Sequence, residues 1–350
     1  MTQTPPSPVD ALPEHAPQGS PDPRVLRCPP ELWPSACARL IERSGEVGQG
    51  PGAIARAAKR FVDTAPAHGI DLHKMWVTRS GNGLGGPRVG QVCLLVCGPG
   101  HTGMLFLSPP GTNKSLGDEE RQRSELAGCI DAAARAADTG LGDARLLQAL
   151  PEPDDDWASL ALESAGFGWV GDLDYLRRHV RPDEASGSVE GLSDGIELAR
   201  LSELGAEGLG LLAMALDRSY EDTLDCPALC GLRDTEDVIA SHRAVGQFDS
   251  SLWWILLKGG EAHGCVLLNP IPASGTLELV YIGLGPALRG QGIAPPLLRR
   301  AVHAAAARGL TEITCAVDQA NAPARKLYDR HGFVRFSGRR AYVKRVSQPS

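Results

Sequence analysis

The sequence predicts an α/β fold with α+β character, in which two lobes each carry a mixed β-sheet flanked by helices on both faces. The chain has 350 residues, which is enough for two well-buried cores. Strand-like and helix-like segments alternate along its C-terminal half, as they do in sheets covered by helices. The end of that half also recurs in weaker form earlier in the chain, so we expect the two lobes to be related.

Two segments without apolar patterning delimit the predicted domains. Residues 1–24 hold seven prolines and almost no large apolar side chains, so we expect a disordered tail. Residues 182–194 are mostly small or polar, which is typical of a linker. The predicted domains are therefore residues 25–181 and residues 195–350.

The half after the linker divides into segments of clear periodicity. In the segment 295–308, for example, Leu297, Leu298, Ala301 and Val302 share one helical face. We expect strands over 195–201, 252–257, 264–268, 276–284 and 312–317, helices over 202–220, 235–244, 295–308 and 321–331, and a terminal hairpin over 333–346. This order predicts a mixed sheet with helices on both faces.

An internal repeat links the two halves. Residues 146–167 overlie residues 312–333 without a gap at an offset of 166, with Asp155 opposite Asn321 and a Gly-Phe pair at the end of each. Upstream, the two strands before the glycine loop correspond to segments 92–96 and 104–107, and the helix after the loop corresponds to segment 119–137. Because α/β units resemble one another, chance could produce part of this match, but the pattern favours a duplication.

Composition excludes several classes of partner. The formal net charge of −7 disfavours non-specific binding to nucleic acid. Glycine and proline interrupt the longest segment without charged residues, 89–113, so we expect no membrane partner. The N-terminus has no basic and apolar signal pattern, and the nine cysteines are scattered, as is usual for reduced thiols. We therefore expect a cytoplasmic protein.

The segment 289–294 carries the clearest signal for chemistry, since it is a glycine-rich turn between a predicted strand and a predicted helix. Unpaired N–H groups and the dipole at a helix N-terminus favour anions. Gly290 and Gly292 would let a pyrophosphate approach the main chain, and Arg289 adds a cation. The alternatives are a tight turn and a solvated arginine. Pro295, which opens the helix, has no N–H to donate.

The wider pattern resembles the GNAT superfamily of acetyl-CoA-dependent N-acetyltransferases. The resemblance depends on Arg289-x-x-Gly292-x-Ala294 after a strand, followed by Asn321, Tyr328 and the Gly-Phe pair. It is good over about residues 195–346 and faint over about residues 28–180. It implies a catalytic C-terminal domain, a degenerate N-terminal domain of the same kind, and acetyl-CoA as acyl donor.

The resemblance also assigns roles to individual residues. Strand main chain would hold the pantetheine arm, the glycine loop would hold the pyrophosphate, and Asn321 would contact the pantetheine. The implied cofactor-binding residues are Ile282, Gly283, Leu284, Arg289, Gly290, Gln291, Gly292, Ile293, Ala294, Pro295 and Asn321. Asn321 also has the right type to cap its helix, with Pro323 just inside it.

Two residues are candidates for catalysis. Tyr328 would protonate the departing thiolate as general acid; the alternative is a core aromatic of an amphipathic helix, but the spacing to Asn321 and the Gly-Phe pair favours the catalytic role. Glu278 lies where several family members keep a catalytic glutamate and would act as base directly or through water; the alternative is an exposed strand carboxylate. Tyr281 is a further lining candidate. Relatives that acetylate protein N-termini have a glutamate where this chain has Ala316, so we do not expect that acceptor.

The acceptor side is expected at the acidic segment 219–227, which would suit a cationic amine unless it is only a solvated loop. Cys226, Cys230 and His242 do not have the spacing of a standard zinc site, so we expect no metal. In the first half, the repeat offset matches the glycine loop to residues 123–128, which lack a glycine where the pyrophosphate would approach. We therefore expect no cofactor site there.

The sequence thus predicts an acyltransferase that moves an acetyl group from acetyl-CoA to the amine of a small molecule or a peptide. Two alternatives stay open: an acyl-CoA-binding sensor or scaffold without turnover, and a tandem acetyltransferase of the mycothiol-synthase type. Tandem relatives that use aminoacyl-tRNA as donor are disfavoured by the glycine loop and the net charge of −7. The oligomeric state is not predicted.

Overall fold

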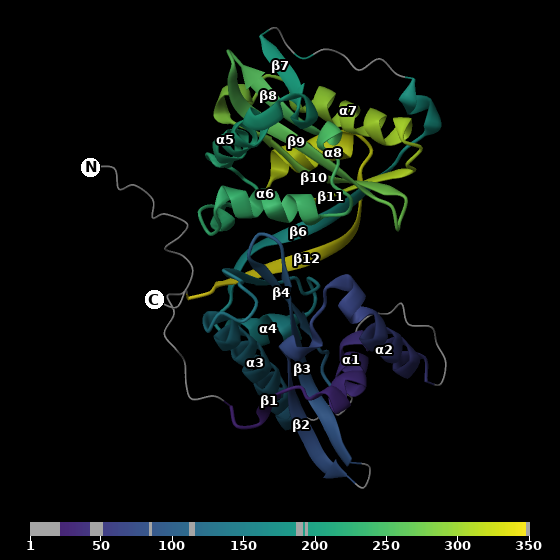
Figure 1. Cartoon of the computed structure of the whole chain (residues 1–350), viewed down its shortest axis with the longest axis vertical. Coiled ribbons are helices and arrows are strands. Elements are labelled where there is room, and N and C mark those ends of the chain that lie inside the picture. The colour runs from purple at the N-terminus through teal and green to yellow at the C-terminus, as the bar shows by residue number, and fades with distance from the viewer. Residues whose placement is uncertain are drawn as a thin grey trace, which may run out of the picture. The chain divides into compact units, whose positions relative to one another are not determined.

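The computed structural model describes residues 22–42, 52–83, 86–111, 116–186, 192 and 195–347. These residues form two compact units (Figure 1). The first contains the described residues up to Trp169 together with those from Arg340 onward, and the second contains Val170–Arg339. Most of the predicted tail and residues 187–191, 193 and 194 of the predicted linker lie outside the described residues. The units are discontinuous in sequence, so the domain boundaries given above stay predictions.

The first unit is a mixed sheet with helices on both faces. Its elements are β1 (Val25–Arg27), α1 (Trp33–Ile41), α2 (Ala53–Thr64), β2 (Met75–Gly83), β3 (Gly86–Gly98), β4 (Thr102–Leu107), α3 (Leu116–Asp138), β5 (Leu146–Ala149) and α4 (Asp156–Ser164). Strands β1 to β4 are antiparallel neighbours, whereas β4 and β5 are parallel. Alternate strand residues pack on α3 and α4 or on α1 and α2, which is the period-two pattern of a sheet buried on both sides.

The second unit has the same kind of architecture. Its elements are β6 (Gly168–His179), β7 (Ile196–Arg200), α5 (Gly208–Tyr220), α6 (Thr235–Ala244), β8 (Trp253–Lys258), β9 (Glu261–Ile271), β10 (Thr276–Leu284), α7 (Ala294–Ala307), β11 (Glu312–Asp318), α8 (Ala322–Arg330) and β12 (Val334–Arg345). The strand order is β12-β6-β11-β10-β9-β8-β7. Side chains of α7 and α8 pack on one face, and those of α5 and α6 on the other. The predicted α/β fold is confirmed.

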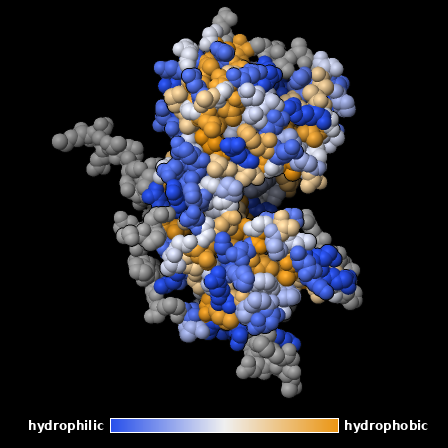
Figure 2. Space-filling model, in the orientation of Figure 1, coloured by the Kyte–Doolittle hydropathy of each residue, from blue (hydrophilic) through white to orange (hydrophobic). Residues whose placement is uncertain are grey.

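The surface agrees with this packing. Figure 2 shows hydrophilic and hydrophobic residues interspersed over the visible face of both units. Within the described residues, no helix combines the length and the apolar character that crossing a membrane requires.

The repeat extends to local geometry. Helices α4 and α8 and strands β6 and β12 begin and end at positions that differ by 166 residues. Asp155 and Asn321 both cap their helices by accepting from the N–H three residues later. Gly166 and Gly332 both have φ of 78°. The matched caps and turns show that the two halves contain the same structural repeat.

The last strands of the two repeats are exchanged between the sheets. The end of β12 pairs with β5, as Arg345 opposite Leu146. Strand β6 pairs with β11 at the equivalent positions, His179 opposite Glu312. Each compact unit therefore contains the closing strand of the other repeat, which explains why the units are discontinuous in sequence.

Three local predictions are wrong. The segment 333–346 is the single strand β12 rather than a hairpin, because Gly338 continues the extended chain and has no positive φ. Residues 201–207 form two short 3₁₀ turns before α5. Residues 123–128 lie inside α3, so they are not the counterpart of the glycine loop. That counterpart is the connection from β4 to α3, of which residues 112–115 lie outside the described part of the chain.

Strands β10 and β11 separate halfway along their length. They pair in parallel only from Thr276 opposite Glu312 to Glu278 opposite Thr314. Strand β10 continues to pair with β9 as far as Leu284, with a bulge between Leu279 and Tyr281. The edge of β10 that faces β11 is therefore open beyond Glu278, which provides the space for a site.

Asn269 ties α6 to the sheet. It is fully buried on β9, accepts from Nε1 of Trp253 at 2.8 Å, and donates to the carbonyls of His242 and Val245 at 2.8 and 2.7 Å. Because these bonds hold the C-terminal end of α6, they also fix the helix that covers this face of β9 and β10.

We expect Asn269→Ala to destabilise the second unit by about 3 kcal/mol, because it removes three hydrogen bonds made by a fully buried amide. Urea unfolding followed by tryptophan fluorescence measures the change, with Gln148→Ala on β5 in the first unit as a control for loss of a side-chain amide. An unchanged unfolding midpoint for the Asn269 variant would contradict this role.

Candidate active site

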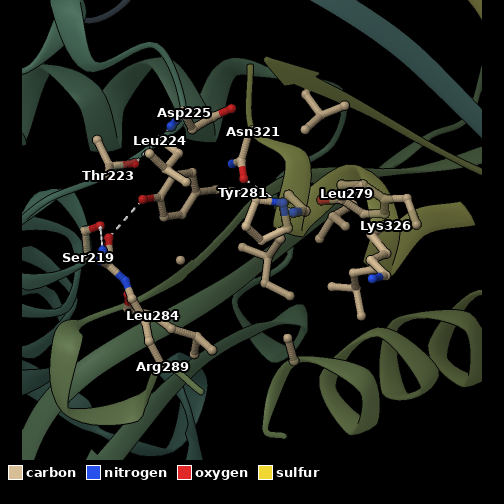
Figure 3. A pocket seen from close by; sticks show the side chains of 18 of the residues that line it. Ser219, Thr223, Leu224, Asp225, Leu279, Tyr281, Leu284, Arg289, Asn321 and Lys326 are labelled. Atoms are coloured by element: carbon tan, nitrogen blue, oxygen red, sulfur yellow. Dashed lines mark hydrogen bonds between the residues drawn. The ribbon is translucent and has the colours of Figure 1, made fainter. Parts of the chain in front are cut away.

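A cavity of about 660 Å³ lies in the second unit where β10 and β11 separate (Figure 3). Its walls come from β10, β11, the start of α7, α8 and the loop after α5. The lining side chains are mixed, with carboxyls and hydroxyls on the loop and apolar groups on the strands. Such a volume is typical of small-molecule sites.

The glycine loop forms one end of this cavity. Gly290 and Gly292 have φ of 73° and 70°, and their Cα hydrogens face open space. Among the described residues, the main-chain N–H groups of residues 290–294 find no hydrogen-bond acceptor. They precede the first turn of α7, where the helix dipole adds positive potential. This arrangement is suited to an anion such as a diphosphate.

The loop residues do not contribute equally. Arg289, Gly290 and Ala294 line the cavity, whereas Ile293 is buried in the core below α7. The Gln291 side chain donates to the carbonyl of Ala287 at 2.6 Å. Pro295 is in the first turn of α7, where its missing N–H costs no helical bond.

Arg289 is held by the protein itself. Its Nε donates to the carbonyl of Leu284 at 2.8 Å, and its two terminal nitrogens donate to the carbonyls of Ser219 and Asp222 at 3.0 and 3.2 Å. The guanidinium thus joins the end of β10, the end of α5 and the glycine loop. It adds positive charge near the loop, but its visible role is to fix these segments.

The three strand residues predicted to contact the pantetheine differ in the direction of their main-chain N–H and C=O groups. The N–H of Gly285 donates to His263 on β9 at 2.6 Å, and the carbonyl of Leu284 accepts from Arg289. Since main-chain groups alternate along a strand, Ile282 and Leu284 face the open edge and Gly283 faces β9. Gly283 still lines the cavity. A side chain there would clash, because a Cβ would lie 2.5 Å from Tyr281 and 2.7 Å from Ser219.

Asn321 caps α8, as expected, and also lines the cavity. Its Oδ1 accepts the capping hydrogen bond from the N–H of Ala324 at 3.2 Å. A hydrogen bond from its side chain lowers the pKa of Asp225, although burial, the larger effect, raises the pKa of that carboxyl overall. Asn321 therefore connects the α8 terminus to the acidic loop.

Tyr328 is 4% exposed and lies on α8 with its ring 5.2 Å from that of Phe333. It belongs to the core cluster and also lines the cavity. Burial raises the pKa of its phenol well above 10, and the neighbouring Cys315 thiol raises it further. The phenol is therefore protonated at neutral pH, as a proton donor requires.

Glu278 lies on the opposite face of the sheet from Leu277 and Leu279, which pack on α7. It does not line the cavity, but it accepts from the hydroxyl of Thr314 on the neighbouring strand. Partial burial raises the pKa of its carboxyl above the usual value. A raised pKa makes the ionised carboxylate a stronger base than an ordinary glutamate, as a general base requires.

Asp225 is a cavity residue that was not selected as a site residue from the sequence. Its Oδ1 accepts from the N–H of Asp318 at 3.1 Å, and Asp318 Oδ2 accepts from the N–H of Cys226 at 2.9 Å. Asp225 stays exposed on the cavity side while protein crowds the carboxyl and raises its pKa. The acidity of segment 219–227 was the available signal, but the residue could not be singled out without the pairing to β11.

Tyr281 on β10 also lines the cavity. Its hydroxyl and that of Ser219 share a hydrogen bond of 2.7 Å (Figure 3). Its ring stacks on His242 with centroids 5.6 Å apart. Burial and the nearby Arg233 lower the pKa of His242 to about 4, so its ring is neutral. Cys226, Cys230 and His242 do not form a metal site; in the described ranges no three His, Cys, Asp or Glu side chains are grouped to hold an ion.

Comparisons with known proteins agree with this geometry. The acetyltransferase (GNAT) family matches residues 218–333, which span the cavity from the end of α5 to the start of β12. A mycothiol acetyltransferase of Beutenbergia cavernae is 28% identical over 185 residues, which are 51% of this chain and 60% of that protein. The match therefore leaves two fifths of the relative's length uncovered.

A solved structure extends the likeness to nearly the whole chain. The GCN5-related N-acetyltransferase from Sphaerobacter thermophilus superposes with a TM-score of 0.57 and 16% identity, covering 95% of this chain and 98% of that one. At this identity the likeness concerns the fold. Residues 218–333, which surround the cavity, thus match the acetyltransferase (GNAT) family, and the chain as a whole is similar in fold to a GCN5-related N-acetyltransferase.

Proposed function

We propose that the protein transfers the acetyl group of acetyl-CoA to the amine of a small molecule or a peptide. The observation that carries this proposal is the row of main-chain N–H groups at residues 290–294, which lie at the N-terminus of α7 without an acceptor among the described residues. A diphosphate would satisfy several of them at once.

The strand edge and α8 supply the remaining contacts in this proposal. Ile282 and Leu284 would bind the pantetheine arm through main-chain groups that face the open edge of β10. Asn321 would contact the same arm, while Arg289 would hold the surrounding segments in place. The thioester would then lie in the separation of β10 and β11, beside Tyr328.

The reaction needs two proton transfers. As the amine nitrogen forms its bond to the acetyl carbon, a carboxyl accepts the amine proton, directly or through water; Glu278 and Asp225 are the two candidates. As the carbon–sulfur bond breaks, Tyr328 donates its proton to the thiolate. A main-chain N–H of the open edge would stabilise the oxyanion between these steps.

We place this activity in the second unit and in the cytoplasm. The nine cysteines are all free thiols in the structure, as is usual in a reducing compartment. The first unit carries the same repeat, and we propose that it supports the working site without binding acetyl-CoA itself.

A second candidate acceptor class follows from one comparison. The name of the Beutenbergia relative points to an acceptor of the mycothiol type, which an assay with amino sugars linked to cysteine would detect. Acetyl-CoA binding without release of free thiol across all amines would instead support a sensor or scaffold.

The phosphate cradle can be tested with Gly292→Glu. Its side chain would bring negative charge to the loop at a position whose φ is 70°, so we expect the affinity for acetyl-CoA to fall by about 100-fold or more. Isothermal titration measures the loss. Gly309→Glu, at the other end of α7 with φ of 68° and the same open surroundings, is the matched control. Retained affinity in the Gly292 variant would remove the basis of the proposal.

The proton donor can be tested with Tyr328→Phe. Loss of the phenol should lower kcat by about 100-fold to 1000-fold while the affinity for acetyl-CoA stays nearly constant, because only the departing thiolate loses a partner. Thiol release measured with a chromogenic disulfide gives kcat. Tyr342→Phe, which removes a buried hydroxyl bonded to Glu163 in the first unit, controls for tyrosine loss. Unchanged turnover would show that Tyr328 is structural.

The pH dependence should identify the base. A base works in its unprotonated form, so kcat/KM should fall as the pH drops through the raised pKa of the responsible carboxyl. Glu278→Gln or Asp225→Asn should abolish this acid limb, whichever residue is the base. The exposed Glu261→Gln is the control. If the limb persists unshifted in both variants, neither carboxyl accepts the proton.

A further inference from the structure

A charged and aromatic strip lies on the sheet face that carries Glu278. On three neighbouring strands, Glu278 of β10 pairs with Thr314 of β11, which in turn pairs with Arg177 of β6. Because paired residues share a face and neighbouring strands are about 4.8 Å apart, the Cα atoms of Glu278 and Arg177 lie roughly 10 Å apart. One pleat further along, Ala316 lies opposite Tyr175. Ala316 is exposed and lines the cavity, so the strip reaches the cavity directly.

The end of the strip away from β10 is built from two rings and two arginines. The rings of Tyr175 and Phe336 meet edge to face with centroids 6.4 Å apart. Arg177 lies 5.4 Å from the centre of the Phe336 ring, and Arg339 lies 5.9 Å from that of Tyr175. Phe336 is 49% exposed, and Arg177 is exposed and forms no ion pair with a described residue. This end therefore offers positive charge beside exposed aromatic surface.

The other end of the strip is acidic. Glu278 borders it on β10, and Asp225 borders it at the end of β11, where it lines the cavity. Both carboxyls act electrostatically on Tyr328, so both lie near the proposed site of the thioester. Tyr175 lies between the two ends, because the charges of both Arg339 and Glu278 act on its phenol.

This charge distribution matches a bipolar ligand. We propose that the strip is the acceptor subsite and that it binds an amine which carries an anionic group, a carboxylate or a phosphate, roughly 10 Å from its nitrogen. The amine lies between Glu278 and Asp225, next to Ala316. The anionic group lies at Arg177, and the intervening part of the acceptor packs on Tyr175 and Phe336. This inference rests on the proposed acetyltransferase function and adds the class of acceptor.

The test uses matched acceptors with and without the anion. Unbranched ω-amino carboxylates of increasing length are compared with the corresponding carboxamides, and an amino-sugar phosphate with the free amino sugar. We expect kcat/KM to favour the anionic member about tenfold or more at the length that spans the strip, mainly through KM. The carboxylate and phosphate series decide which anion the subsite prefers.

Arginine variants assign the effect to the strip. Arg177→Gln should lower kcat/KM for the anionic acceptors by about tenfold or more relative to the carboxamides, so that the preference for the anion disappears. Arg243→Gln is the matched control, because Arg243 also stacks on an aromatic ring, Phe248 at 4.5 Å, but does not line the cavity. Equal rates for anionic and neutral acceptors, or an equal loss of both in Arg177→Gln, would overturn the inference.

Measurements of acceptor binding distinguish a failure of the acceptor subsite from a failure of the proposed acetyltransferase function. Isothermal titration of the full chain with the same carboxylate and carboxamide pairs, in the presence of CoA, reports on the strip without turnover. Absence of acetylation with all amines would refute the proposed function alone, provided that the carboxylates bind more tightly and Arg177→Gln abolishes the difference. Equal binding of both members would refute the subsite even in an active enzyme.

Discussion

The site depends on one interruption of hydrogen bonding, the point after Glu278 and Thr314 where β10 and β11 cease to pair. Main-chain groups on the open edge need water or a ligand, because an unpaired group removed from water costs free energy. The bulge between Leu279 and Tyr281 turns the strand at the same place while its pairing with β9 continues. The sheet thus stays intact on one side and presents unpaired main chain on the other.

The loop after α5 is fixed where this opening needs a wall. Asp225 accepts a hydrogen bond from the N–H of Asp318, and Asp318 accepts one from the N–H of Cys226. These two bonds hold the loop at the end of β11. Asp222 and Cys226 have φ of 50° and 44°, a conformation that side chains other than glycine adopt at a cost. Arg289 adds bonds from the other end of the loop. A strained loop held at both ends keeps a fixed shape before any ligand arrives.

Local patterns were sufficient to predict much of the fold. Helix α6 and strand β10 have the predicted bounds, because each has a complete period of apolar residues between clear turn signals. The repeat offset also persists in the caps of α4 and α8, which depend on residues close in sequence. The glycine loop followed from the same kind of local evidence.

The remainder depends on contacts between distant segments. That Ile282 and Leu284 rather than Gly283 face the open edge follows from the partners of β10, and no local pattern contains them. The carbonyl partners of Arg289 lie up to 70 residues away. Asp225 stands out among its acidic neighbours only because it is paired with Asp318 on β11. Similarly, the extended Gly338 resembles a turn until its strand is seen to be continuous.

The exchange of β6 and β12 has a consequence for how the chain can be divided. If the chain were cut between the repeats, each fragment would keep a closing strand that pairs with the other fragment's sheet. In its own sheet, the position beside β5 or β11 would be empty. Neither fragment could complete its hydrophobic layer alone, and the vacant places would be unprotected edges prone to association. Each half therefore needs the other to complete its sheet. A mutation that destabilises β6 weakens the sheet of β11, and one that destabilises the end of β12 weakens the sheet of β5.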